Sequence, residues 1–349
     1  MPIVGLEHLV PNEMLVRDFE VDTENTFTKS FKQGQILFGR RRAYQQKAGV
    51  AQFDGICSGD ITVIEAIPGK IEPNLLPFIV QNEQFFEHAV QGSAGSLSPR
   101  VKWEHLASYE IELPTMEKQR VLADKLWTAY RLKESYKKLL AATDEMVKSQ
   151  FIEMFGERTT TPVGYYIKDS FPGDWGKEDL DGTGVKVIRT TNFTNFGKLN
   201  LSEVVTRSIE ERKIQKKQIL KYDTILERSG GTADNPVGRV VLFEEDEQYL
   251  CNNFTQVLRF KDIDPRFAFY ALFYFYQMNK TSIRSMGSKT TGIQNLNMSK
   301  YLEIGIPNAD EDEQKQFVSI AEQADKSKFE LRKSTEAIDR VIKSLINNV

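Results

Sequence analysis

A run of basic, amide and aromatic side chains near the N-terminus is the first candidate for chemistry in this sequence. Residues 25–53 contain six Lys and Arg residues and no Asp or Glu. Most of them gather in residues 39–47, GRRRAYQQK, which lie between two predicted strands and therefore form a loop. Arginine can pair with guanine and glutamine with adenine, while lysine neutralises phosphate. We therefore predict DNA contacts here, with a merely solvated basic loop as the alternative. The predicted residues are Arg40, Arg41, Arg42, Tyr44, Gln45 and Lys47.

A loop with different side chains occupies the equivalent place in the second half of the chain. Residues 227–235, ERSGGTADN, again follow a predicted strand. Two domains that contact different base sequences would need equivalent loops with unrelated hydrogen-bonding groups. The predicted DNA-binding residues of this loop are Arg228, Ser229, Thr232 and Asn235.

A second pair of loops supports the same hypothesis. Residues 265–302 contain five Lys and Arg residues and no acidic one. Hydroxyl and amide side chains beside lysine suit phosphate and base-edge contacts, although they are also common in ordinary turns. The candidates are Ser93, Arg100 and Lys102 in the first half, Lys289, Thr290, Gln294 and Asn295 in the second, and Asn192 after a predicted strand at residues 186–188.

Signatures of catalysis are missing from the sequence. It contains no glycine-rich phosphate loop, no GxGxxG fingerprint and no Asn-Pro-Pro-aromatic motif of amino-methyltransferases. His8, His88 and His105 are scattered without metal-ligand spacing, so we expect them to be structural. We therefore predict a binding protein that has no catalytic residue, no metal and no cofactor of its own.

Two long helices are predicted to position these loops. Residues 115–157 contain no Pro and no Gly before Gly156, and apolar residues recur there at alternating steps of four and three. This is the heptad seam of a helix that packs against another helix. The seam reappears 195 residues later, within residues 308–349, including the lysine that interrupts it, Lys133 or Lys328. The residues predicted to pair the helices are Leu122, Leu126, Tyr136, Leu140, Val147, Phe317, Leu331, Ile338, Ile342 and Leu345.

The matching seams indicate an internal duplication, because the polar interruptions also match in one unbroken register. Each half is predicted to contain short strands, an apolar aromatic helix at residues 74–90 or 265–283, and a closing strand at residues 107–113 or 304–307. The Phe and Tyr run of the second helix is more typical of a core than of base stacking. The predicted organisation is a first domain (1–114), a long helix (115–157), a second domain (158–307) and a second long helix (308–349).

Composition points to ordinary globular material, with 40% hydrophobic and 27% charged residues among 349. A net charge of −3 gives no global sign of nucleic-acid binding, so any DNA-binding surface must be local. No apolar run approaches the roughly 20 residues that cross a bilayer, and the N-terminus lacks the features of a signal peptide. Cys57 and Cys251, at nearly equivalent points of the repeat, favour buried thiols in a reducing cytoplasm.

The order of these features resembles the specificity subunits of type I restriction–modification systems. A strand, Leu113-Pro114, the short run Glu117-Lys118-Gln119-Arg120 and a long helix recur after a variable domain, with Glu313-Gln314-Lys315 as the second run. The likeness covers nearly the whole chain and rests on the duplicated arrangement, since no single motif is specific. The chain departs from the family by being short at its N-terminus, so we expect a shortened first recognition domain.

The resemblance implies an α/β fold with two target-recognition domains, separated by two long helices that pair as an antiparallel coiled coil with pseudo-twofold symmetry. In that family, each recognition domain reads half of a split site in double-stranded DNA, and the helices dock two methyltransferase (modification) subunits. The partner would supply S-adenosylmethionine and the catalytic residues, and a restriction-translocation subunit could also join. Two alternatives stay open: the specificity subunit of a split type II restriction–modification enzyme, and a coiled-coil scaffold that does not bind DNA.

Overall fold

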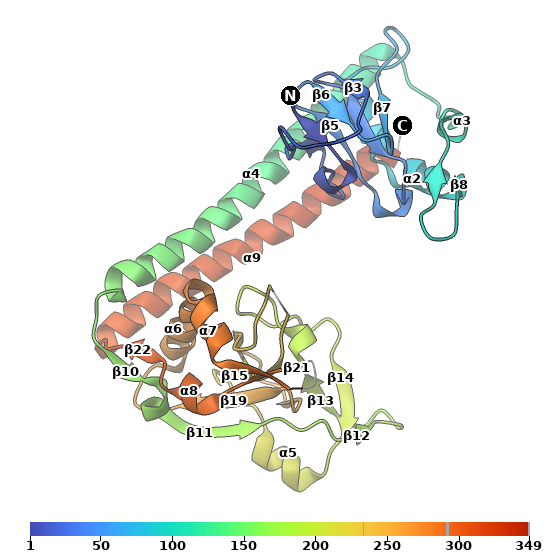
Figure 1. Cartoon of the computed structure of the whole chain (residues 1–349). Coiled ribbons are helices and arrows are strands. Elements are labelled where there is room, and N and C mark those ends of the chain that lie inside the picture. The colour runs from blue at the N-terminus through green and yellow to red at the C-terminus, as the bar shows by residue number, and fades with distance from the viewer. Residues whose placement is uncertain (233, 291–292, 348–349) are drawn as a thin grey trace. The chain divides into compact units, whose positions relative to one another are not determined.

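The computed structural model describes residues 1–232, 234–290 and 293–347. The chain divides into two compact units: unit 1 contains Met1–Leu140 and Phe329–Val349, and unit 2 contains Ala141–Lys328. Each unit combines a body of strands and short helices with one stretch from each of two long helices (Figure 1). These helices are α4, Met116–Phe155, and α9, Glu311–Asn347. The fold is mixed α/β, as predicted.

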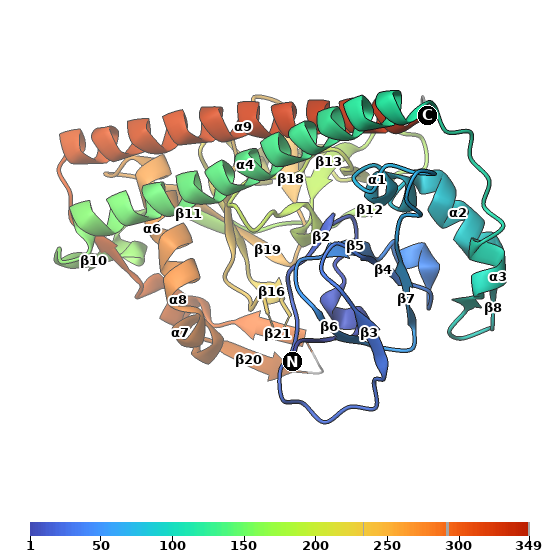
Figure 2. The same cartoon turned by 90° about the horizontal axis from the view of Figure 1, so that it is seen from above.

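The stretches of α4 and α9 run antiparallel within each unit. In unit 1, Lys133 Nζ lies 2.6 Å from Asp339 Oδ1, and in unit 2, Lys328 Nζ lies 2.8 Å from Asp144 Oδ1. In unit 1, Lys133 follows Leu126 on α4, whereas Asp339 precedes Ile342, the cluster neighbour of Leu126, on α9. In unit 2, Phe151 follows Asp144 on α4, whereas Phe317, its ring partner, precedes Lys328 on α9. Within each unit the two stretches lie side by side in both views (Figures 1 and 2). Each lysine that interrupts the seam therefore meets a carboxylate on the facing helix.

Side chains at the predicted seam positions are buried or half-buried on both helices. In unit 1, Leu126 shares a hydrophobic cluster with Ile342 and Leu345. In unit 2, the rings of Phe151 and Phe317 pack with their centroids 5.1 Å apart. Of the residues predicted to pair the helices, the buried ones are Leu126, Val147 and Phe317. The half-buried ones are Leu122, Tyr136, Leu140, Leu331, Ile338, Ile342 and Leu345.

Unit 1 is built around two sheets with the strand orders β2-β5-β4-β7 and β1-β6-β3. Phe38 of β4 packs against Phe85 and Phe86 of α2, with ring centroids 5.5 Å apart in each pair, and so joins sheet to helix. The strands are β1 (Ile3–Val4), β2 (Leu15–Val16), β3 (Lys29–Phe31), β4 (Ile36–Gly39), β5 (Ala48–Ala51), β6 (Gly55–Cys57), β7 (Ile61–Ile64), β8 (Ser93–Ala94) and β9 (Arg100–Val101). The short helices are η1 (Leu6–His8), η2 (Ala43–Gln45), α1 (Leu76–Val80), α2 (Glu83–Gln91) and α3 (Trp103–Leu106).

Unit 2 contains the sheets β11-β19-β15-β17, β12-β14-β13-β18 and β16-β21-β20, and the pair β10-β22. Its largest core cluster joins α6 to strands of the first sheet and to the α4 and α9 stretches of this unit. The strands are β10 (Thr160–Pro162), β11 (Ile167–Pro172), β12 (Lys177–Glu178), β13 (Val185–Ile188), β14 (Val205–Ser208), β15 (Thr224–Glu227), β16 (Ser229–Gly230), β17 (Val240–Leu242), β18 (Tyr249–Cys251), β19 (Thr255–Phe260), β20 (Gly287–Thr290), β21 (Ile293–Leu296) and β22 (Gly305–Pro307). The short helices are η3 (Val163–Tyr166), η4 (Thr190–Asn192), α5 (Glu211–Lys217), α6 (Pro265–Met278), α7 (Lys280–Ser285) and α8 (Met298–Leu302).

The internal repeat of the sequence is also present in the strand pairing and hydrogen bonds of the two units. The parallel pair of β1 and β6 in unit 1 corresponds to the parallel pair of β13 and β18 in unit 2. The buried Gln119 accepts a hydrogen bond from the N–H of Glu72 and donates one to the carbonyl five residues before it. Gln314, 195 residues later, does the same with the N–H of Asp264. Each glutamine thereby ties the start of its long helix to the body of its own unit.

Three predicted elements differ in the structure. Residues 107–113 form no strand, whereas their counterpart β22 does, and β22 pairs antiparallel with β10. The helix predicted at 74–90 is broken into α1 and α2, since the side chain of Asn82 accepts a hydrogen bond from Gln84 N–H and begins a new helix. In the second half, the helix at 265–283 likewise breaks at Asn279, and most aromatic side chains of α6 are buried, as expected of a core.

Candidate nucleic-acid interface

Unit 1 brings its two predicted binding loops into contact. A backbone bridge joins Arg41, in the segment after β4, to Arg100 of β9. The N–H of Arg42 also donates to the carbonyl of Pro99 over 2.8 Å. Two segments that are far apart in the sequence therefore share one surface.

Asp60 holds two of the predicted arginines of this surface. Its carboxylate accepts hydrogen bonds from Arg100, with Nε 2.6 Å from Oδ1 and Nη2 3.2 Å from Oδ2. Arg41 Nη1 lies 3.6 Å from the same carboxylate. The hydrogen bond from Arg100 lowers the pKa of Asp60 below its ordinary value, so this side chain is a carboxylate at neutral pH. No sequence pattern marked Asp60, because its partners come from two other segments.

The outward-facing donors of unit 1 gather in the turn after the bridge. Arg42 has a left-handed backbone (φ 54°), which turns the chain into η2. Arg42 and Gln45 are exposed, and the side chain of Tyr44 is 56% exposed. Lys102, after β9, is exposed as well. These four exposed side chains can contact a ligand without any rearrangement of the core.

Two other predicted residues, Lys47 and Ser93, are hydrogen-bonded inside unit 1, and a third, Arg40, is half-buried. Lys47 Nζ donates to the carbonyl of Leu6 over 2.7 Å, and Ser93 Oγ donates to the carbonyl of Ala89 over 2.8 Å. Arg40 is half-buried, and its buried Nε has no hydrogen-bond partner among the described residues. DNA contacts of Lys47 and Ser93 would first have to break these bonds, and they stay a prediction.

Unit 2 brings its predicted loops together in the same way. β16 pairs antiparallel with β21, with Ser229 opposite Asn295, and Ser229 Oγ donates to Asn295 Oδ1 over 2.7 Å. Asn295 lies 195 residues after Arg100, so the two bridging positions are equivalent in the repeat. Ser229 is buried, while the other described side chains of this surface are exposed or half-buried: Arg228, Thr232, Asn235, Gln294 and Asn295. The side chains of Lys289 and Thr290 lie outside the described part of the chain.

A buried ion pair closes the loop of residues 228–238. Glu227 is 2% exposed, and Arg239 reaches it with Nε 2.7 Å from Oε2 and Nη2 3.2 Å from Oε1. Burial lowers the pKa of Arg239, but the attraction of Glu227 more than offsets this, and the pKa is raised. Nothing in the sequence marked these two residues, because their pairing joins the end of β15 to the segment before β17.

Asn192 does not belong to this surface. It is 4% exposed, and its Oδ1 accepts a hydrogen bond from Arg189 N–H over 2.9 Å. Its Nδ2 donates to the carbonyls of Asn200 and Glu203, each over 3.0 Å. The amide therefore organises its own loop, and the prediction of a DNA contact is corrected to a structural role.

The side chains considered for metal and redox chemistry have other roles. The rings of His88 and His105 stack with centroids 4.2 Å apart. Burial raises the pKa of Cys57 and Cys251 to about 11, so both thiols stay protonated, as expected of buried structural cysteines. Within residues 1–232, 234–290 and 293–347, no three His, Cys, Asp or Glu side chains are grouped as metal ligands would be. In the same ranges, no helix combines the length and apolarity needed to cross a membrane.

Comparison with known proteins identifies relatives of the chain. Residues 170–339 match the family model of the type I restriction modification DNA specificity domain. The type I restriction enzyme EcoDI specificity subunit of Escherichia coli is 23% identical over 165 residues, which are 44% of this chain and 36% of that protein. The chain thus spans about a third of this curated relative.

Solved structures share the fold. A chain from a type I R-M system, studied for complex assembly and conformational transition, has a TM-score of 0.57 and 15% identity, covering 99% of this chain and 90% of that one. The S subunit of a type I restriction-modification system from M. genitalium has a TM-score of 0.52 and 13% identity, covering 97% of this chain and 89% of that one.

Proposed function

Its specificity domain makes this chain a member of the type I restriction–modification specificity family, and we propose that it reads a bipartite site in double-stranded DNA. Each unit would contribute one target-recognition domain, and α4 and α9 would pair as an antiparallel coiled coil between them. The chain itself would perform no catalysis. Its buried, unpaired cysteines suit the reducing cytoplasm, where we place the complex.

The observation that carries this proposal is the pair of equivalent surfaces with different side chains. Both units join two distant loops at positions related by the repeat. The bridging residue is Arg100 in unit 1 and Asn295 in unit 2. Around it stand Arg42, Tyr44 and Gln45 in one case, and Arg228 and Gln294 in the other. Arginine and glutamine recognise guanine and adenine through different donor patterns, so the two surfaces suit two different half-sites.

Exposed apolar side chains on the unit 1 stretch of α4 support the docking of partner helices. Leu132 and Leu139 lie seven residues apart and are 44% and 50% exposed. Apolar side chains at one heptad position favour the packing of a further helix. We propose that modification subunits, two of them by the repeat, dock along the long helices and supply S-adenosylmethionine and the catalytic residues. A restriction-translocation subunit would join the same complex.

Selection from randomised duplex DNA, with the chain co-purified with its modification subunits, tests the proposal. We expect a split motif with a fixed gap. Arg42→Ala and Gln294→Ala should each relax base preference in one half-motif only, because each removes a donor from a single unit. Lys168→Ala is the matched control, since Lys168 is exposed on β11, outside the paired loops.

Each other outcome has a definite meaning. A motif with a single half would restrict DNA reading to one unit. No enrichment while the modification subunits stay bound would contradict the proposal and would favour a scaffold that does not bind DNA.

A further inference from the structure

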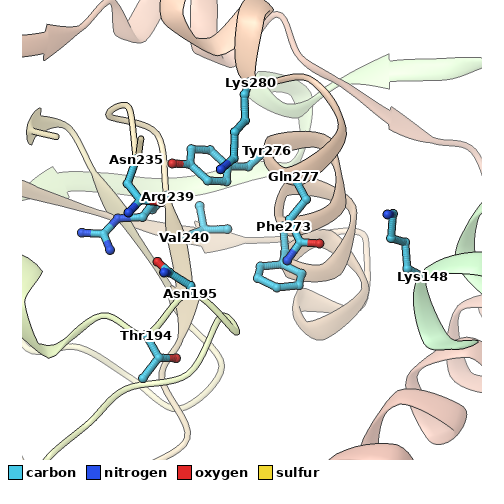
Figure 3. A pocket seen from close by; sticks show the side chains of 10 residues that line it. All are labelled: Lys148, Thr194, Asn195, Asn235, Arg239, Val240, Phe273, Tyr276, Gln277 and Lys280. Carbon is cyan, nitrogen blue, oxygen red and sulfur yellow. The ribbon is translucent and has the colours of Figure 1, made fainter. Parts of the chain in front are cut away.

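Unit 2 contains a half-open pocket of about 280 Å³ beside its paired loops (Figure 3). Lys148 of α4, Gln277 of α6 and Lys280 of α7 line it from the helical side. Asn195, after η4, and Asn235, in the loop before β17, line it from the other side (Figure 3). The pocket is therefore enclosed by segments that only the tertiary structure brings together.

The pocket offers two lysines to a ligand. Its lining includes Lys148, Arg239 and Lys280 and no Asp or Glu, and the charge of Arg239 is balanced by the buried Glu227. Lys280 Nζ donates a hydrogen bond to the backbone carbonyl of Asp234 over 3.3 Å. Lys148 pairs at 3.4 Å with Glu145, whose side chain is 71% exposed, and such exposed pairs are weak. The two lysines can therefore turn their charge to an anion in the pocket at little cost.

The remaining walls suit the other parts of a nucleotide. Phe273 is partly buried and presents an aromatic surface to the pocket. Asn195 and Gln277 are exposed, and their amide groups have no hydrogen-bond partner among the described residues. Figure 3 shows Asn195 on one side, with Phe273 and Gln277 on the other. Aromatic stacking, amides for a base edge and cations for a phosphate are the groups with which proteins bind nucleotides.

The repeat does not account for this pocket. At the spacing of 195 residues, Lys280 corresponds to Phe85 and Phe273 corresponds to Phe78. Phe85 is 6% exposed and Phe78 is 1% exposed. In unit 1, core side chains therefore occupy the positions that line an open polar pocket in unit 2. Reading a half-site through paired loops, which both units share, does not require it.

We propose that this pocket binds the phosphate-bearing part of a nucleotide, with the phosphate beside Lys280 and the base or sugar against Phe273. The nucleotide is either free in solution or belongs to a DNA strand that passes the paired loops. The chemistry of recognition is the same in both cases. The proposal goes beyond the proposed function, because the binding of a free nucleotide does not depend on sequence-specific DNA recognition.

Two binding measurements on the full chain with its modification subunits distinguish the two sources. Adenosine monophosphate is titrated calorimetrically, and duplex DNA binding is measured over a range of salt concentrations. The variants are Lys280→Gln and Gln277→Ala, and Lys168→Gln is the control outside the pocket. Thermal unfolding verifies that each variant is folded.

If the ligand is a free nucleotide, adenosine monophosphate binding should weaken at least tenfold in Lys280→Gln and Gln277→Ala and stay unchanged in Lys168→Gln.

If the ligand is a DNA strand, Lys280→Gln should reduce the magnitude of the slope of log K against log salt by about 0.9, the value for one phosphate contact. Gln277→Ala would then weaken DNA binding without changing the slope.

The inference is overturned if Lys280→Gln and Lys168→Gln behave alike in both measurements. A split motif from the selection experiment, obtained together with that result, would support the proposed function and contradict only nucleotide binding in the pocket. Adenosine monophosphate binding that neither pocket variant weakens would also overturn it.

Discussion

Gln119 and Gln314 show at the scale of single residues why the two halves keep the same side chain. Gln119 is 2% exposed and Gln314 is 9% exposed, and each satisfies one backbone N–H and one carbonyl. A buried polar group without a partner costs about 1–3 kcal/mol. The amide therefore matters more for stability than the apolar part of the side chain.

Gln314→Ala should lower the free energy of unfolding by about 2 kcal/mol, since it leaves the N–H of Asp264 without its partner. Urea unfolding of the full chain measures this loss. Gln316→Ala, at an exposed position of the same helix, is the control and should change stability by less than about 0.5 kcal/mol. Equal effects of the two variants would contradict the role given to Gln314.

Asp60 acts at the same scale on the binding surface of unit 1. Asp60→Asn removes the charge that holds Arg41 and Arg100 and should leave both guanidinium groups less ordered. We expect the variant to lose base preference in one half-motif, with the gap and the other half unchanged. The selection experiment measures this, and a loss spread equally over both half-motifs would count against it.

At the scale of elements, the packing of α9 in unit 2 depends on a half-buried carboxylate. Asp325 Oδ2 lies 2.9 Å from Lys198 Nζ, and Asp325 Oδ1 lies 2.8 Å from Lys328 Nζ. Tyr270 donates its hydroxyl to the same carboxylate over 3.3 Å. Burial raises the pKa of Asp325, but the two lysines more than offset this, and the pKa lies below its ordinary value. Asp325 thus links α9 to α6 and to the segment after η4.

The lowered pKa of Asp325 predicts a dependence of stability on pH. A carboxylate with a lowered folded-state pKa stabilises fully above its unfolded value of about 3.9 and loses this contribution as the pH falls through the folded value. Thermal unfolding between about pH 7 and pH 2.5 should therefore show a smaller acid-induced loss for Asp325→Asn than for the wild type. The variant should be less stable at neutral pH. Asp312→Asn, at an exposed position of α9, should follow the wild-type curve; the prediction fails if Asp325→Asn follows it too.

At the scale of the whole molecule, the proposed function makes the length of the long helices part of DNA recognition. A heptad inserted between Leu140 and Ala141 in α4, matched by one between Leu331 and Arg332 in α9, preserves the seam and the register of the facing helices. Seven helical residues add about 10 Å, or roughly three base pairs at 3.4 Å each. The selected motif should keep both halves and gain about three base pairs in its gap. An unchanged gap would contradict a spacer role for the helices.

The sequence by itself determined the long helices, their seams and the repeat. These features depend on local periodicity, on Pro114 and Gly156 beside α4, and on the matching of Lys133 with Lys328. All of them can be read from the amino-acid sequence alone. It also pointed to the loops around Arg42 and Arg228, because charge and amide content is a local property.

Only the tertiary structure decided which residues of those loops stand together and which are engaged elsewhere. Asp60 joins Arg41 to Arg100, and Glu227 pairs with Arg239 across a loop, while Asn192 turns its amide inward. The physical reason is the same in each case. Hydrogen bonds and ion pairs between distant segments depend on the packing of the strands that carry them, and residue type alone does not specify that packing.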